Sequence, residues 1–254
     1  MKQVPIRGKE ELKNEAAICR LLKEFGVMTV PDYVSAADLE IIRNEFLFGL
    51  SQPESKFIKP FPYSEGKGCL VLNDEIDREV FPATSCIFNA EWMRSLSEQY
   101  LGGRVDLNHS IYFVRDVVGS KHHANDLHFD VQRCFKFFIY LQDTTVDNGA
   151  FACVPGSLTN AADIRSRYGE KISYDNRELT RDLPFMEKDA VPVEGKAGTL
   201  IIFDTDVFHR AGSVSAGERW VMRGHTRIHT GDVQGGANSG TSFMTKLKKI
   251  FKSE

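Results

Sequence analysis

The second half of the chain contains the strongest β-strand patterns, and these limit the fold more than any other feature. Residues 131–141 include three phenylalanines, an isoleucine and a tyrosine in close succession, which is typical of a strand buried on both faces. Residues 199–204 form a second apolar run behind Gly198, and residues 219–229 alternate as a strand with two different faces does. These separate strands predict a sheet-rich core in this half.

The first half is patterned as helices. Apolar residues recur at helical spacing in residues 10–25, 36–50 and 90–101. Gly26 ends the first of these segments, and Ser35 precedes the second as an N-cap. Helices followed by a block of strands predict an α+β protein whose strands form a barrel or a sandwich.

No boundary between domains is visible in the sequence, and 254 residues are within the range of one large β-rich domain. We therefore expect residues 1–254 to form a single domain. Its parts would be a helical flank at about 9–101, a strand core at about 108–230 and a flexible tail at 231–254. The tail is expected because residues 231–242 contain four glycines and no apolar pattern.

Charge and cysteine content limit the class of partner. The net charge of −3 gives no reason to expect nucleic acid as a partner. The N-terminus has no apolar signal segment, and no run reaches the ~18 apolar residues of a membrane span, so stable membrane insertion is not expected. Five cysteines without paired spacing favour reduced thiols in a cytoplasmic protein. The oligomeric state is open.

A short motif, His128-Phe129-Asp130, leads into the first buried strand. Residues two apart on an extended strand point to the same side, so one imidazole and one carboxylate can reach a common point. His209 follows the second buried strand and would supply another imidazole. Two histidines and one carboxylate on one face of a metal, with open positions opposite, are the ligands of non-haem Fe(II) oxygenases.

A basic side chain would complete such a site if the cosubstrate were 2-oxoglutarate, because a guanidinium binds a carboxylate through two hydrogen bonds. Arg219 lies ten residues after His209, at the start of the alternating strand. We expect Arg219 to bind the cosubstrate. Arg227 shares the same predicted strand face, and we expect it to lie on a solvated part of that face.

The motifs together resemble the phytanoyl-CoA dioxygenase family of Fe(II)/2-oxoglutarate oxygenases. The resemblance runs from about residue 25 to residue 227 and depends on landmarks in the order and spacing of the family. The landmarks are His128-Phe129-Asp130, Asn148-Gly149, Pro155-Gly156-Ser157, and the pair His209 and Arg219. The resemblance implies a double-stranded β-helix core (a jelly roll, or cupin-like fold) with flanking N-terminal helices.

The resemblance also implies a metal centre and an activity. His128, Asp130 and His209 would be the catalytic iron ligands. The cofactors would be Fe(II), 2-oxoglutarate as cosubstrate, and O2. The implied enzyme is a dioxygenase that hydroxylates an unactivated C–H of a small-molecule metabolite. Halogenation is disfavoured because related halogenases have a small residue where this chain keeps Asp130, whereas desaturation, cyclisation and epimerisation stay open.

The resemblance assigns the cosubstrate pocket to residues on three predicted strands. Arg219 would bind the distal carboxylate of 2-oxoglutarate, Arg115 falls at a position that is often basic, and Phe138 falls where many members have a lining tryptophan. Lys136 shares a strand face with Phe138 and is a further candidate. The spacing from His209 to the arginine is one residue shorter than in many members, which leaves Arg223 as an alternative.

Two other classes of protein are compatible with parts of this pattern. A catalytically silent jelly-roll binding protein would share the fold, but the complete triad argues against it. A zinc hydrolase would use the same three ligands around a metal-bound water. The arginine after His209 and the lack of an obvious general base argue against the hydrolase. The substrate itself is not readable; its contacts are expected in residues 57–74 and 158–190.

Overall fold

The computed structural model describes residues 2–52, 69–72, 78–120, 123–180 and 184–229. Its core is two packed antiparallel sheets, one of six strands and one of three. The larger sheet contains, in spatial order, β1 (Val27–Val30), β7 (Leu200–Asp204), β4 (Phe135–Tyr140), β9 (Glu218–Ile228), β3 (Val105–Val117) and β2 (Cys69–Leu72). The smaller sheet contains β6 (Val191–Val193), β5 (Phe151–Cys153) and β8 (His209–Arg210).

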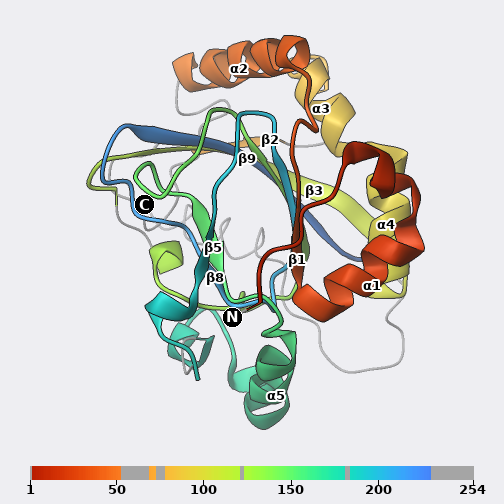
Figure 1. The fold of residues 1–254 in the computed structure, drawn as a ribbon, viewed down its shortest axis with the longest axis vertical. Helices are drawn as coiled ribbons and strands as arrows, with labels where there is room; N and C mark the ends of the chain where they lie inside the picture. The colour runs from red at the N-terminus through yellow and green to blue at the C-terminus, as the bar shows by residue number, and fades with distance from the viewer. Residues whose placement is uncertain (1, 53–68, 73–77, 121–122, 181–183, 230–254) are drawn as a thin grey trace, which may run out of the picture.

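The helices lie on both sides of this core (Figure 1). The first four, α1 (Glu15–Phe25), α2 (Ala36–Ser51), α3 (Pro82–Phe88) and α4 (Glu91–Leu101), pack against the larger sheet through one apolar cluster. The fifth, α5 (Leu158–Tyr168), packs near the ends of β5 and β8 through a separate cluster. These helices beside two antiparallel sheets confirm the predicted α+β class. None of the helices in the described ranges has both the length and the hydropathy that a membrane span needs.

The helix boundaries follow from local capping. The structure divides the predicted helix at residues 10–25 into the 3-10 helix η1 (Lys9–Lys13) and α1. The division occurs because the side chain of Asn14 accepts a hydrogen bond from the N–H of Ala17 and so caps a new helix. Gly26 ends α1 with a φ of 75°, a conformation that glycine adopts without strain. The predicted cap at Ser35 is confirmed.

The sequence prediction missed two elements between residues 52 and 90. One is α3, which begins with Pro82 at a position where the missing N–H costs nothing. The other is β2, an edge strand paired with β3. Much of the loop predicted at residues 57–74 lies outside the described residues, as does the predicted tail at 231–254. The prediction of a single domain stays a prediction.

The two faces of β4 and β9 have different surroundings. Phe135, Phe137 and Ile139 of β4 join Met222 of β9 in the cluster beneath the helices. The alternate residues therefore point between the two sheets, where Val221 belongs to the inner cluster. Four further residues of β9 share this inner face: Arg219, Arg223, His225 and Arg227.

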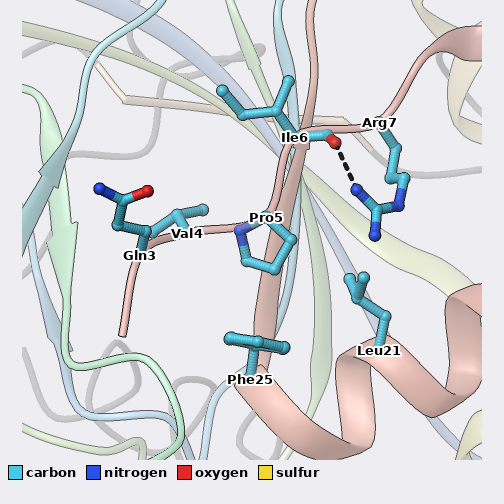
Figure 2. Close-up of a pocket in the computed structure, with 7 residues that line it drawn as sticks. All are labelled: Gln3, Val4, Pro5, Ile6, Arg7, Leu21 and Phe25. Atoms are coloured by element: carbon cyan, nitrogen blue, oxygen red, sulfur yellow. Dashed lines mark hydrogen bonds between the residues drawn. The ribbon is translucent and has the colours of Figure 1, made fainter. Parts of the chain in front are cut away.

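The N-terminal segment forms an additional edge next to β1. Thr29 exchanges backbone hydrogen bonds with Pro5 and Arg7, each 2.9 Å long. A cavity of about 550 Å³ lies between this segment and α1 (Figure 2). It is lined by Gln3, Val4, Pro5, Ile6, Arg7, Leu21 and Phe25. None of the site residues predicted from the sequence lines this cavity.

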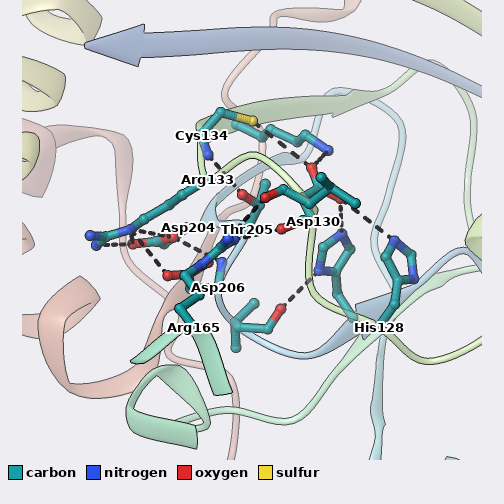
Figure 3. A network of polar contacts seen from close by, with 12 residues as sticks. His128, Asp130, Arg133, Cys134, Arg165, Asp204, Thr205 and Asp206 are labelled. Atoms are coloured by element: carbon teal, nitrogen blue, oxygen red, sulfur yellow. Dashed lines mark hydrogen bonds and ion pairs between the residues drawn. The ribbon is translucent and has the colours of Figure 1, made fainter. Parts of the chain in front are cut away.

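An arginine of α5 holds the loop that follows the His128-Phe129-Asp130 motif (Figure 3). Arg165 donates hydrogen bonds to the backbone carbonyls of Asp130 at 2.5 Å and Val131 at 2.9 Å. Its guanidinium also donates to the carboxylate of Asp206 at 2.7 Å. Burial raises the pKa of Asp206, and the hydrogen bonds from Arg165 oppose that rise. Arg165 therefore joins α5, the motif loop and the end of β7.

The buried carboxylate of Asp204 connects the same loop to the helical layer. It accepts hydrogen bonds from Arg133 at 2.5 Å and from the hydroxyl of Tyr100 on α4 at 2.8 Å. Burial and the nearby Asp204 raise the pKa of Tyr100, so its phenol keeps the proton that it donates. Thr205 adds two contacts: its carbonyl accepts from the N–H of Asp130 at 3.0 Å, and its hydroxyl accepts from the N–H of Cys134 at 2.8 Å.

A glycine in β9 allows the helical layer to approach the larger sheet. A Cβ atom at Gly224 would overlap the Asn108 side chain and lie 2.6 Å from the Phe88 ring. We expect Gly224→Ala to lower the free energy of unfolding by about 1–3 kcal/mol, as overpacking does, measured by urea denaturation. Gly103→Ala is the matched control, because its nearest neighbour would be Ile228 at 3.9 Å. Equal stability of the two variants would contradict this packing.

Substitutions of two arginines on α5 test whether Arg165 holds the loop that follows the His128-Phe129-Asp130 motif. We expect Arg165→Met to lower the free energy of unfolding by about 3 kcal/mol, because Asp206 is then buried with a weakened partner. The estimate is at the low end for buried pairs because Arg133 still lies 3.5 Å from Asp206. Arg167→Met, which removes an exposed pair with Asp163, should cost less than about 1 kcal/mol. A small loss for Arg165→Met in the same denaturation assay would contradict the role of Arg165.

Candidate metal centre

His128 and His209 lie side by side although they are far apart in the sequence. Each backbone N–H donates to the carbonyl of the other residue, at 3.0 and 2.7 Å. The Nε2 atoms of the two rings lie 3.6 and 3.5 Å from Oδ1 of Asp130. All three potential ligand atoms fall within 4.8 Å of one another. The structure thus brings together the three metal ligands predicted from the sequence.

Hydrogen bonds orient both imidazole rings for metal binding. Nδ1 of His128 lies 2.7 Å from the carbonyl of Asp126, and Nδ1 of His209 lies 2.8 Å from that of Val207. A carbonyl only accepts, so each Nδ1 carries a hydrogen, and Nε2 is the ring nitrogen left to bind a metal. Burial lowers the pKa of His209 to about 4, which keeps this imidazole neutral.

Lys136 holds the other oxygen of the central carboxylate. Its buried ammonium donates a hydrogen bond of 2.6 Å to Oδ2 of Asp130. Burial alone would raise the pKa of Asp130, but Lys136 and the two imidazoles outweigh it and hold the pKa well below the usual range. Asp130 is therefore ionised, with Oδ1 directed toward the histidines. Two imidazoles and one carboxylate fit a divalent transition metal such as Fe(II).

Phe138 lies in the aromatic layer behind the triad. Its ring packs 4.8 Å from the Phe203 ring and 5.8 Å from the Phe151 ring, measured between centroids. Both of these rings also pack against His209, at 5.2 and 5.8 Å. The structure therefore places Phe138 near the metal centre, as a wall of the site.

Arg219 has buried partners of its own. Its buried guanidinium donates to the carboxylate of Asp116 and to the carbonyl of Gly149. On β9, His225 is the residue that pairs with Lys136 across the strands. Arg219 is six residues from His225, or about 20 Å along the strand.

Arg115 also lies away from the triad. Its side chain is 45% exposed and pairs with Glu218 at 2.7 Å. The guanidinium lies over the Trp220 ring, 6.0 Å from its centroid. Trp220 packs with the cluster beneath the helices, so Arg115 is on the opposite face of the sheet from Asp130. The structure does not support contact between Arg115 and a bound cosubstrate.

Three other residues of β9 lie on the inner face, in or beside the part of the strand that pairs with β4. Arg223 lies over the rings of Phe138 and Tyr112, 5.7 and 5.3 Å from their centroids. The ring of His225 packs 4.7 Å from that of Tyr112. Arg227, predicted to lie on a solvated surface, is half-buried on the same inner face. Arg227 is an even number of residues from the apolar Val221, and this spacing puts both on one face of a strand. That was the sequence signal that could have placed Arg227 inside.

The sequence matches a known protein family over more than half of its length. Residues 64–221 match the family described as phytanoyl-CoA dioxygenase (PhyH). Phytanoyl-CoA dioxygenase 1 from Oryza sativa subsp. japonica is 26% identical over 194 residues, covering 71% of this chain and 67% of that protein. Phytanoyl-CoA dioxygenase from Arabidopsis thaliana is 34% identical over 83 residues, covering 32% of this chain and 28% of that protein.

Solved structures show the same fold at low sequence identity. The epimerase SnoN, in complex with Fe3+, alpha ketoglutarate and nogalamycin RO, has a TM-score of 0.62 and 14% identity, covering 89% of this chain and 93% of SnoN. The carbocyclase SnoK has a TM-score of 0.59 and 16% identity, with 83% and 82% coverage. HygX from Streptomyces hygroscopicus, with nickel and 2-oxoglutarate bound, has a TM-score of 0.54 and 15% identity, with 86% and 87% coverage.

These comparisons agree with the fold of two packed antiparallel sheets. The two sheets form the jelly-roll core that the sequence predicted, with flanking helices at the N-terminal side. The family and the donor set identify the cofactors as iron and 2-oxoglutarate, with O2 as the oxidant. The chain belongs to the phytanoyl-CoA dioxygenase family and is an Fe(II)- and 2-oxoglutarate-dependent oxygenase.

Proposed function

We propose that His128, Asp130 and His209 bind the catalytic Fe(II) and that the enzyme hydroxylates an unactivated C–H of a small-molecule metabolite. The observation that carries this proposal is the convergence of two imidazole Nε2 atoms on one carboxylate oxygen. With 2-oxoglutarate and O2, bound iron supplies the oxidising chemistry. The chain orients the ligands through backbone carbonyls and through Lys136. Asp130 favours hydroxylation over halogenation, because its carboxylate takes the position that a halide would need.

Arg223 is the residue of β9 best placed to bind the distal carboxylate of 2-oxoglutarate. The four carbon–carbon bonds of the cosubstrate, each about 1.5 Å, span only about 5 Å. Arg223 is two residues from the level of His225 and Lys136, about 7 Å along the strand. Arg219 is three times as far, and breaking its buried pair with Asp116 would cost about 3–5 kcal/mol. These positions favour Arg223 over Arg219, the residue that the family resemblance implies.

Lys136 and Phe138 then have roles other than direct recognition of the cosubstrate. The ammonium of Lys136 is already bound to Oδ2 of Asp130, so its function is to hold that carboxylate with Oδ1 toward the metal. Phe138 forms an apolar wall beneath the guanidinium of Arg223. We also propose a cytoplasmic location, because Cys19, Cys86, Cys134 and Cys153 are free thiols, as is typical of a reducing compartment.

Turnover of 2-oxoglutarate tests the proposed metal ligands. The wild type, with Fe(II), ascorbate and a panel of small metabolites, should form succinate. His128→Ala should reduce succinate formation by at least about 100-fold, since even losing a partner of a metal ligand costs 10–100-fold. His229→Gln is the matched control, because His229 pairs with Asp106 away from the triad. Succinate formation by His128→Ala at the wild-type rate would refute the ligand set, and a wild type that forms none would favour a binding protein or a zinc hydrolase.

Binding of 2-oxoglutarate separates the two arginines. Arg223→Gln should weaken binding by about 10–150-fold, the loss expected for hydrogen bonds to a charged group. Arg219→Gln should lower the free energy of unfolding and leave the affinity of the folded protein for 2-oxoglutarate nearly unchanged. Calorimetric titration of the Ni(II)-loaded variants, with unfolding measured in parallel, provides both values. If Arg219→Gln loses affinity and Arg223→Gln does not, the distal carboxylate of 2-oxoglutarate is bound by Arg219.

A further inference from the structure

The hydroxyl of Ser157 does not cap the helix that it precedes. Ser157 is the residue before α5, where a serine side chain usually accepts a hydrogen bond from an N–H group of the first turn. Within the described residues of α5, no such bond forms. Oγ of Ser157 instead accepts the backbone N–H of Phe208 at 2.9 Å. Ser157 is 1% exposed, so this contact is buried, and it joins the start of α5 to the residue before His209.

The turn that follows β5 holds Phe208 at both of its backbone groups. Besides the bond from its N–H to Ser157, the carbonyl of Phe208 accepts the N–H of Val154 at 2.8 Å. Pro155 and Gly156 form the turn, and Gly156 has a φ of 86°, a conformation that glycine adopts without strain. The Pro155-Gly156-Ser157 landmark of the sequence therefore fixes the residue directly before a metal ligand.

Phe208 is connected to all three proposed ligands. It is adjacent to His209, whose N–H and carbonyl both form hydrogen bonds with the backbone of His128. The Phe208 ring is fully buried and packs edge to face against the ring of Phe129, with 5.5 Å between the centroids. In the sequence, Phe129 lies between His128 and Asp130. A shift of Phe208 would therefore move the imidazole of His209 relative to the carboxylate of Asp130.

We propose that Ser157 is a positioning residue for the metal centre, and that its hydrogen bond to Phe208 keeps Nε2 of His209 at 3.5 Å from Oδ1 of Asp130. The inference rests on the proposed function, because it takes His209 and Asp130 as metal ligands. Metal affinity depends on the groups that orient the ligands as well as on the ligands themselves. A serine that only stabilised the fold would change the free energy of unfolding and leave metal binding by the folded protein unaltered.

Metal binding by serine variants tests this role, with Ni(II) titrated by calorimetry into the metal-free full-length protein. Ser157→Ala should weaken Ni(II) binding by about tenfold, the low end of the loss that follows removal of a partner of a metal ligand. Ser157→Thr, which keeps the hydroxyl, should bind Ni(II) more tightly than Ser157→Ala. Ser97→Ala is the matched control, because Ser97 is also buried and its hydroxyl donates to the carbonyl of Met93 on α4 at 2.6 Å. It should keep the wild-type affinity.

The visible absorption of bound Co(II) provides a second measurement, because its bands depend on the geometry of the ligands. Ser157→Ala should shift these bands, and Ser97→Ala should not. If Ser157→Ala does not fold, Ser157→Gly removes the same hydroxyl at little cost, since glycine is tolerated before a helix. Wild-type affinity and bands without the hydroxyl, or a Ser157→Thr affinity as low as that of Ser157→Ala, would overturn the role of Ser157. Failure of the proposed function is distinct, since the wild type would then bind Ni(II) no more tightly than His128→Ala.

Discussion

The hydrogen bond between Lys136 and Asp130 is the interaction on which the site depends. A carboxylate beside two buried imidazoles would gain a proton or turn away if nothing stabilised its charge. The ammonium of Lys136 provides that stabilisation on one oxygen and leaves the other directed at the histidines. Because Lys136 is on β4 and Asp130 is on the preceding loop, the strand and the loop must be correctly paired before the ligands converge.

The same loop is held from two further directions. Arg165 reaches it from α5, and the buried Asp204 connects it through Arg133 and Tyr100 to the helical layer. The carboxylates of Asp204 and Asp206, which accept from these arginines, are buried, and a missing partner is costly there. The flanking helices, which contribute no metal ligand, thus take part in positioning Asp130.

Much of this arrangement follows from local sequence patterns. The buried strands, the helix caps at Ser35 and Gly26, and the pairing of His128 with Asp130 each depend on near neighbours and on a period of two or 3.6 residues. The assignments that the structure does not support concern partners across the sheet. That Asp116 neutralises Arg219, or that Arg115 points toward Trp220, depends on the register of β3 against β9. Spacing along one strand carries no information about that register.

The buried pair of Arg219 and Asp116 has a consequence for how variants of this enzyme are interpreted. It cross-links β3 and β9 within the interior, at a distance from the metal. If Arg223 binds the cosubstrate as proposed, a protein without Arg219 would lose activity through a loosened scaffold, and one without Arg223 through an empty cosubstrate pocket. A screen that records only product yield would give both the same phenotype. Stability and occupancy must be measured on the same samples before either arginine is given a chemical role.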